Sequence, residues 1–153
     1  MINYGKKFEQ KFKEDFLKIP NSSLDRLYDN VSNYLGINNI CDFIGYIFPN
    51  IFYIECKSIK GTLFPLQNLT QYERLLPKVG IRGVRVGVVI WFYEQNRVLY
   101  VPISSITKMK EDGLKSINLK TIDKYNYIEI PSRLKKTYMD SDYTILINTI
   151  EGD

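Results

Sequence analysis

The sequence predicts an α/β fold in which helices flank a central mixed β-sheet. The prediction rests on the order of elements along the chain, which runs helix, hairpin, helix, hairpin. With 153 residues, 44% of them hydrophobic and 25% charged, the chain has the composition of one globular domain with a substantial core. We expect a single domain over residues 1–153, with a core up to about residue 103 and a basic C-terminal extension over residues 104–153.

Residues 4–18 have the pattern of an amphipathic helix. Tyr4, Phe8, Phe12 and Phe16 recur at every fourth position and form an apolar stripe. Glu9 borders this stripe, so one interpretation places its carboxylate near the sheet as part of a site. The alternative, a solvated helix charge, is the commoner case for a single glutamate, and the pattern alone does not decide between them.

Residues 40–57 are predicted to form a β-hairpin, because two apolar runs flank the turn sequence Phe48-Pro49-Asn50. Cys41 and Cys56 lie in the two arms. We expect them to be small buried residues with reduced thiols, although they could also face one another.

Three charged residues interrupt this hairpin. Glu55 and Lys57 are two residues apart on one arm and therefore share a face, and a hairpin in register brings Asp42 beside Glu55. Two carboxylates are ligands suited to Mg²⁺, with Mn²⁺ as an alternative. A bound metal there would lower the pKa of a coordinated water and stabilise charge on a substrate phosphate, with Lys57 orienting the attacking water or offsetting developing charge. The simpler alternative is a surface hairpin with a cross-strand ion pair.

A second helix is expected to begin near Thr70. Thr70 and Glu73 have the spacing of a capping box, which places Gln71 in the first turn, and Pro77 and Gly80 end the helix early.

The second hairpin has the strongest strand signal of the chain. Residues 84–93 are β-branched and aromatic, a turn follows at residues 94–96, and residues 98–103 return as the next strand. Residues 143–147 are predicted to form one more short strand.

The composition also excludes several classes of function. The chain has no histidine, so histidine-dependent catalysis and histidine zinc sites are excluded. No apolar run is long enough to span a membrane, and the polar N-terminus lacks the apolar core of a signal peptide, so we expect a cytoplasmic protein without a membrane partner. The net charge of +4 permits a polyanionic partner without requiring one.

Basic residues outside the hairpin are candidates for contact with nucleic acid. Lysines are spread over residues 104–124, and tyrosines are interleaved among the later ones. A solvated surface is an equal alternative, because acidic residues dilute the cluster. Arg26 is a candidate phosphate contact, or else an ion-pair partner of Asp25 or Asp29. The candidate DNA-binding residues are Arg26, Lys60, Lys115, Arg133, Lys135 and Lys136.

Short motifs along nearly the whole chain together resemble the RecU-type Holliday junction resolvases, including their shorter phage-encoded relatives. They are Gly5-Lys6-Lys7-Phe8-Glu9, Cys41-Asp42-Phe43-Ile44, Glu55-Cys56-Lys57-Ser58, Gly61 with Phe64-Pro65-Leu66, Gln71 with Leu75, Gly83-Val84, Gly113-Leu114-Lys115-Ser116-Ile117 and Ile128-Glu129-Ile130-Pro131. Each motif is short, but their order and spacing are more specific than the Asp…Glu-x-Lys pattern alone. That pattern itself resembles the signature of the restriction-endonuclease-like, or PD-(D/E)XK, nucleases.

The resemblance implies a restriction-endonuclease-like core and a homodimeric, Mg²⁺-dependent endonuclease that nicks four-way DNA junctions symmetrically, in recombination, repair or phage DNA processing. It implies that Asp42, Glu55 and Glu9 bind the metal, that Lys57 assists the water, and that Gln71 has a supporting or phosphate-facing role. Larger members carry a stalk before the catalytic aspartate. Here residues 19–39 are short and polar and are expected to be the least regular part of the chain, so we expect a reduced stalk, which leaves junction selectivity open. A less selective branched-DNA nuclease and a non-catalytic nucleic-acid-binding module are the alternatives.

Overall fold

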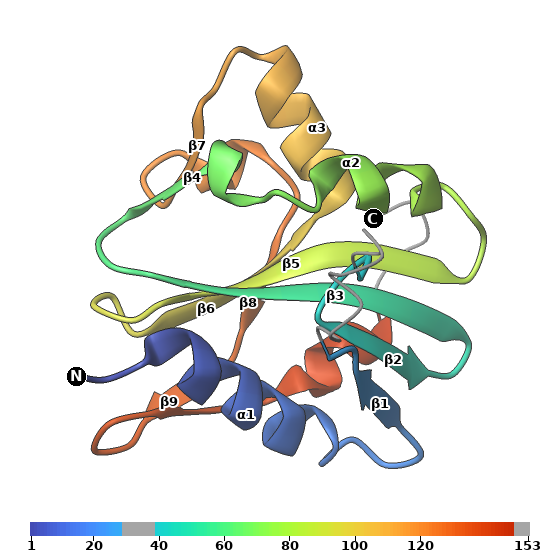
Figure 1. The fold of residues 1–153 in the computed structure, drawn as a ribbon, viewed down its shortest axis with the longest axis vertical. Helices are drawn as coiled ribbons and strands as arrows, with labels where there is room; N and C mark the ends of the chain where they lie inside the picture. The colour runs from blue at the N-terminus through green and yellow to red at the C-terminus, as the bar shows by residue number, and fades with distance from the viewer. Residues whose placement is uncertain (29–38, 149–153) are drawn as a thin grey trace.

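A six-stranded mixed sheet forms the centre of the molecule in the computed structural model, which describes residues 1–28 and 39–148 (Figure 1). The strand order is β1-β2-β3-β5-β6-β8. β3 and β5 are parallel and every other neighbouring pair is antiparallel, so the predicted α/β fold with a mixed sheet is confirmed. The strands are β1 (Ser23–Arg26), β2 (Phe43–Ile47), β3 (Asn50–Ile59), β5 (Val84–Phe92), β6 (Arg97–Pro102) and β8 (Ile128–Ile130).

Helices and short strands cover both faces of this sheet. The helices are α1 (Tyr4–Phe16), α2 (Tyr72–Leu75) and α3 (Ile103–Glu111), with 3-10 turns η2 (Leu66–Asn68), η3 (Leu76–Lys78), η4 (Ile122–Lys124) and η5 (Tyr143–Asn148). Two small antiparallel pairs complete the described fold, β4 (Leu63–Pro65) with β7 (Ser116–Asn118) and β9 (Ser132–Leu134) with β10 (Met139–Ser141). α1, β9 and η5 lie on one face of the sheet, whereas α2, α3, β4 and β7 lie on the other (Figure 1).

α1 is the amphipathic helix that the apolar stripe predicts. It begins after Asn3, whose side chain accepts a hydrogen bond from the Lys6 backbone N–H at 3.1 Å. Phe8, Phe12 and Phe16 are all buried against the sheet. Gly45 in β2 permits this close packing, because a Cβ there would lie 3.0 Å from the Phe16 ring.

The hairpin of β2 and β3 is also confirmed, and its register pairs Phe43 with Ile54. β2 begins at Phe43, so beyond Ile54 the remainder of β3 is paired only with β5. This creates a notch in the sheet beside residues 55–59. Cys41 and Cys56 are both buried and free, and they belong to the cores on opposite faces of the sheet.

Three sequence-based expectations are corrected by the structure. Thr70 is not a helix cap, because α2 begins at Tyr72, with Gln71 at the N-cap position and no side-chain capping bond. Residues 143–147 form no strand but lie in η5, where Tyr143 and Leu146 are buried. Residues 19–28, expected to be irregular, contain β1, whose Leu24 is buried.

The rest of the expected stalk region, residues 29–38, lies outside the described residues. Residues beyond 103 pack into the same core as those before it. α3 buries Ile103, Ile106 and Met109, and β8 adds the sixth strand to the sheet. No helix within the described residues is long and apolar enough to cross a membrane.

Candidate active site

The notch beside β3 brings together the acidic residues that the sequence singled out. Asp42 lies just before β2, and its Oδ2 accepts a hydrogen bond from the Cys56 backbone N–H at 2.9 Å. β2 begins only at Phe43, so this bond takes the place of the next ladder bond between β2 and β3. It fixes Asp42 beside Glu55. The predicted meeting of Asp42 and Glu55 is therefore seen in the structure.

Glu55 is a buried carboxylate, only 2% exposed. Its Oε1 lies 3.4 Å from Lys57 Nζ, as expected for two residues on one face of a strand. Its Oε2 is buried and has no hydrogen-bond partner. Burial, followed by the negative charge of Asp42, raises the pKa of Glu55 to about 8, while Lys57 acts in the opposite direction. A buried polar atom without a partner is unfavourable, which makes this oxygen a candidate for binding a ligand.

Glu9 reaches the notch from α1, on the other face of the sheet. Its carboxylate Oε2 lies 3.0 Å from Nη2 of Arg26. Partial burial and the nearby charge of Asp42 raise the pKa of Glu9, and the Arg26 guanidinium opposes that rise. Glu9 is therefore ion-paired and partly buried rather than a freely solvated helix charge, and its part in a metal site stays a prediction.

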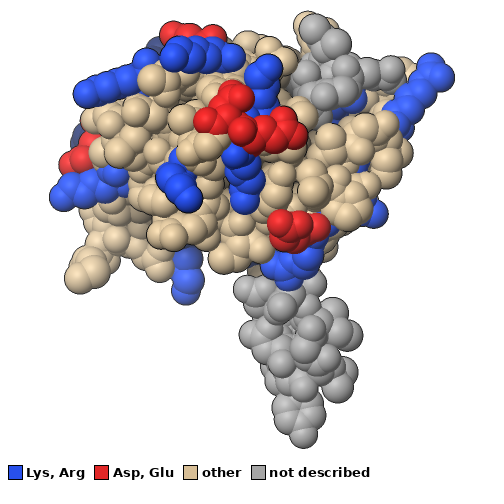
Figure 2. Space-filling view, turned by 90° about the horizontal axis from the view of Figure 1, so that it is seen from above, with Lys and Arg blue, Asp and Glu red and all other residues tan. Residues whose placement is uncertain are grey.

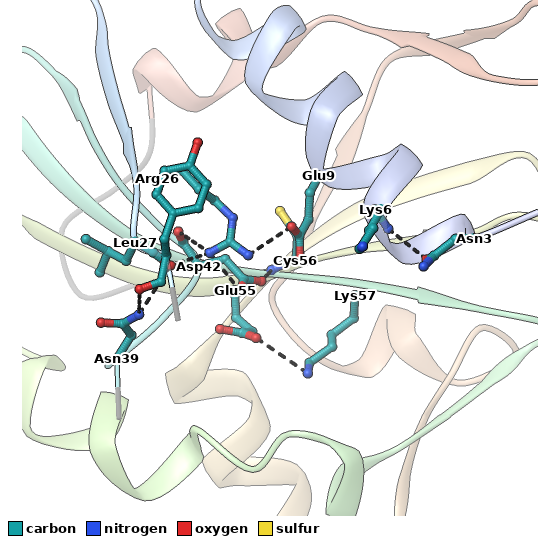
Figure 3. A network of polar contacts seen from close by, with 11 residues as sticks. Asn3, Lys6, Glu9, Arg26, Leu27, Asn39, Asp42, Glu55, Cys56 and Lys57 are labelled. Atoms are coloured by element: carbon teal, nitrogen blue, oxygen red, sulfur yellow. Dashed lines mark hydrogen bonds and ion pairs between the residues drawn. The ribbon is translucent and has the colours of Figure 1, made fainter. Parts of the chain in front are cut away.

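Arg26 lies between two of these carboxylates (Figure 3). β1 pairs with β2 so that Arg26 stands opposite Phe43, and Nη1 of Arg26 lies 3.6 Å from Asp42 Oδ1. The ion pairs of Arg26 within the described residues are with Glu9 and Asp42, and Asp29, one of the two partners considered from the sequence, lies outside those residues. Sequence reasoning missed this placement, because the partners of Arg26 are 16 and 17 residues away and only strand pairing brings them together.

The site suits a divalent cation in its donor chemistry. Asp42 and Glu55 supply oxygen ligands, and the unpartnered Oε2 of Glu55 is an available donor. As arranged here, no three acidic or cysteine side chains among residues 1–28 and 39–148 are gathered closely enough to hold an ion by themselves. The carboxylate of Glu9 is instead paired with Arg26.

Gln71 lies in the layer that covers the same sheet face as Glu55. Its Oε1 is buried without a hydrogen-bond partner, the same condition as Glu55 Oε2. The supporting role expected for Gln71 stays a prediction.

The two cysteines have no chemical role that their surroundings support. Burial raises the pKa of Cys41 to about 12, and burial raises that of Cys56 well above its usual value. Both thiols therefore stay protonated and behave as apolar core residues.

The candidate DNA-binding lysines fall into separate places. Lys60 and Lys136 line one groove with Tyr4, Trp91 and Tyr93, in which the Tyr4 and Tyr93 rings stack 3.9 Å apart. Lys115 lines a different hollow between β4, β7 and the end of α3.

The basic tail is not one continuous surface. Arg133 is exposed on β9, while Lys135 lies 3.8 Å from Asp140. Figure 2 shows the end of the molecule that carries α3, where basic side chains are scattered and acidic ones lie among them. The interleaved Tyr125 and Tyr127 donate their hydroxyls to Asp112 and Asp123. The alternative of a solvated surface fits residues 104–124 better than a DNA-stacking face.

Comparison with known proteins agrees with this geometry. The family of RecU, recombination protein U, matches residues 12–142. The chain belongs to the RecU family. The family expected from the sequence motifs is thus confirmed, and the match includes Asp42, Glu55 and Lys57 but begins after Glu9.

The fold is similar to that of Hjc, a Holliday junction resolvase from the archaeal hyperthermophile Archaeoglobus fulgidus. The TM-score is 0.58 at 16% sequence identity, over 79% of this chain and 93% of Hjc. No curated protein sequence matches the chain.

Proposed function

We propose that this RecU-family protein is a metal-dependent endodeoxyribonuclease that cleaves four-way DNA junctions. The single observation that carries the proposal is the buried Oε2 of Glu55, which has no partner and lies in a notch beside Asp42 and Lys57. Membership of the RecU family and the fold shared with the resolvase Hjc support DNA junctions as the substrate.

Asp42 and Glu55 would hold the cation, most simply Mg²⁺ with Mn²⁺ as a substitute. When bound, such an ion lowers the pKa of a coordinated water and stabilises negative charge on a phosphate. The β2–β3 register fixes the two carboxylates relative to each other, and the Cys56 N–H holds Asp42 in place.

Lys57 is placed to act on the phosphate or on the attacking water. Its side chain is 24% exposed, whereas that of its partner Glu55 is 3% exposed, so the ammonium lies where the site opens to solvent. A fixed positive charge there offsets the charge that develops on the phosphate during cleavage. Gln71 is proposed to support the same face, and Glu9 to complete the site from α1.

DNA would approach over the groove that holds Lys60 and Lys136, with Arg133 nearby on β9. Lysines contribute phosphate contacts that do not depend on base sequence. Two symmetric cuts in a four-way junction require two sites, so we propose a homodimer with two-fold symmetry.

The test is a cleavage assay on three DNA substrates, namely a synthetic four-way junction, a linear duplex of the same sequence and a single strand, each with Mg²⁺ and with EDTA. We expect paired nicks in the junction that require Mg²⁺ and little cutting of the other two. Equal cutting of duplex and junction would indicate a less selective nuclease on this fold. Binding of the junction without cutting, under any divalent ion, would overturn the proposal in favour of a binding module.

A further inference from the structure

The guanidinium of Arg26 lies between Glu9 of α1 and Asp42. It forms an ion pair with Glu9 at 3.0 Å and approaches Asp42 at 3.6 Å, so one cation bridges two of the three carboxylates (Figure 3). All three side chains are only partly buried, with 19%, 28% and 17% of Arg26, Glu9 and Asp42 exposed.

Several contacts hold the guanidinium in this place. Nη1 of Arg26 donates to the backbone carbonyls of Leu27 and Asp42, the latter at 3.2 Å. The guanidinium also lies 5.4 Å from the centre of the Phe43 ring and 5.7 Å from that of Tyr28. The backbone contacts arise from the pairing of β1 with β2, so this conformation of Arg26 is set by the fold and is not an incidental surface pair.

The negative charges of the neighbouring carboxylates explain why a positively charged side chain is favourable at this place. Glu9, Asp42 and Glu55 bring three carboxylates into one notch, and the neighbouring Asp42 acts against ionisation of both glutamates. Arg26 and Lys57 are the cations that offset them. A divalent ion at Asp42 and Glu55 would bring two further positive charges close to the guanidinium, which repels them.

We propose that Arg26 is a built-in counterion that competes with the metal ion. In the arrangement seen here it neutralises Glu9 and Asp42, and a divalent cation held by Asp42 and Glu55 would displace it from Asp42. This inference rests on the proposed function, since it concerns the metal site of that nuclease. It explains why the three carboxylates do not form one ligand group in the arrangement seen here.

The strength of the pair fits such an exchange. Partly exposed ion pairs contribute little free energy, so a divalent ion is able to displace the guanidinium. Asp15 on the same helix shows what a permanent pair looks like. Its side chain is 1% exposed and is bound by Lys11 and Lys18 at 2.9 and 3.0 Å.

The test is calorimetric titration of the DNA-free protein with Mn²⁺, comparing wild type with Arg26→Gln. We expect Arg26→Gln to bind Mn²⁺ about tenfold more tightly, because no guanidinium has to be detached, a change of about 1.4 kcal/mol. The matched control is Arg97→Gln, which removes the Arg97–Glu129 pair on β6 and β8 and leaves Mn²⁺ affinity unchanged. Equal or weaker binding by Arg26→Gln, or no Mn²⁺ binding by the wild type, would overturn the inference.

A second measurement uses the wild-type protein, so it does not depend on the variant folding. The arginine Nε–H signals are followed by NMR during titration with Mg²⁺. We expect the Arg26 signal to move with the same midpoint as Mg²⁺ binding while that of Arg97 stays in place. An Arg26 signal that does not respond to saturating Mg²⁺ contradicts the inference.

The outcomes separate this inference from the proposed function. Metal binding that depends on Arg26 in a protein that cuts no DNA would overturn the nuclease and leave the counterion role. Junction cleavage by a protein whose metal affinity ignores Arg26 would overturn only the counterion role.

Discussion

Two buried carboxylates in this molecule are equally hidden from solvent and yet are built differently. Asp15 on α1 and Glu55 on β3 are each 2% exposed. Both oxygens of Asp15 are satisfied, Oδ1 by Lys11 and Lys18 and Oδ2 by the Ser141 backbone N–H at 3.0 Å. Glu55 has one distant lysine and an Oε2 with no partner.

The difference indicates what each carboxylate is for. Asp15 joins α1 to β10, two elements 126 residues apart in sequence, and so acts as a structural clamp. Glu55 Oε2 has no hydrogen-bond partner, so its burial is a cost to folding. Burial alone therefore does not distinguish the two acids in this fold, whereas the unsatisfied oxygen of Glu55 does.

The substitution Glu55→Gln is the strongest test of the difference between Glu55 and Asp15. We expect junction cleavage to fall by at least about 1000-fold, because the amide removes the charge that binds the cation while keeping the shape of the side chain. Binding of the junction should persist, since phosphate contacts are made elsewhere. Rates are measured under single-turnover conditions with saturating protein.

Asp15→Asn is the matched control for that experiment and should cut junctions at close to the wild-type rate. A Glu55→Gln protein that cuts as fast as wild type would remove Glu55, and with it the assigned site, from the mechanism.

The pH dependence of the free energy of unfolding should next reveal the raised pKa of Glu55. The pKa of Glu55 in the folded, metal-free protein is raised from 4.5 to about 8, so between these values the folded chain holds a proton that the unfolded chain has lost. Glu55 therefore makes the free energy of unfolding fall as pH rises through this window, by on the order of 1 kcal/mol per pH unit at most. Chemical denaturation in EDTA at several pH values measures it.

The control for the pH experiment is again Glu55→Gln, in which this contribution is absent. Between about pH 5 and pH 8, the free energy of unfolding should fall more with rising pH in the wild type than in the variant. Parallel curves would show that Glu55 ionises normally and is not held in a desolvated state.

Asp15→Asn tests the structural side of the comparison. We expect a loss of about 2 kcal/mol in the free energy of unfolding, because the amide weakens charge-assisted hydrogen bonds to two lysines. Urea denaturation checks this, with Glu14→Gln as the control, since Glu14 forms only an exposed bond with Gln10 on the same helix. A loss no larger than that of the control would mean that the clamp between α1 and β10 contributes nothing.

The smallest effects are expected for substitutions of two neighbouring lysines, Lys135 and Lys136. Lys135 pairs with Asp140, which also binds Lys11 and so belongs to the outer part of the Asp15 cluster. Lys136 instead lines the groove with Lys60. Lys136→Ala should lower junction affinity a few-fold and reduce the slope of its salt dependence by about one.

Lys135→Ala should change that slope less than Lys136→Ala and alter stability by under about 0.5 kcal/mol, because its ion pair is exposed. Fluorescence anisotropy at several salt concentrations distinguishes the two. If neither substitution changes the slope, the tail is not part of the DNA footprint.

The sequence predicted those parts of the fold in which local pattern and tertiary packing agree. The phenylalanine stripe of α1 and the alternation of Glu55 with Cys56 are both enforced by burial, so periodicity was sufficient. α3 was missed because Ser104, Ser105 and Thr107 interrupt its apolar face, although Ile103, Ile106 and Met109 recur at every third position. The segment after residue 142 is apolar without a strand partner, which is why it coils into η5.

The sequence predicted which acidic residues and which lysine meet in the candidate site, but not that Arg26 pairs with two of the carboxylates. Asp42, Glu55 and Lys57 follow from one hairpin and its register. The place of Arg26 depends on the pairing of β1 with β2, and no local signal in the sequence predicts it. The orphaned oxygen of Glu55 is a property of the folded packing and has no sequence signature.

Crystals of the protein grown with Mn²⁺ and measured at a wavelength where manganese scatters anomalously test the central claim most directly. The account predicts an anomalous peak in the notch, within coordination distance of Asp42 and of Glu55 Oε2, and no peak at Asp15. A notch without manganese, in crystals that carry the ion elsewhere, would contradict it.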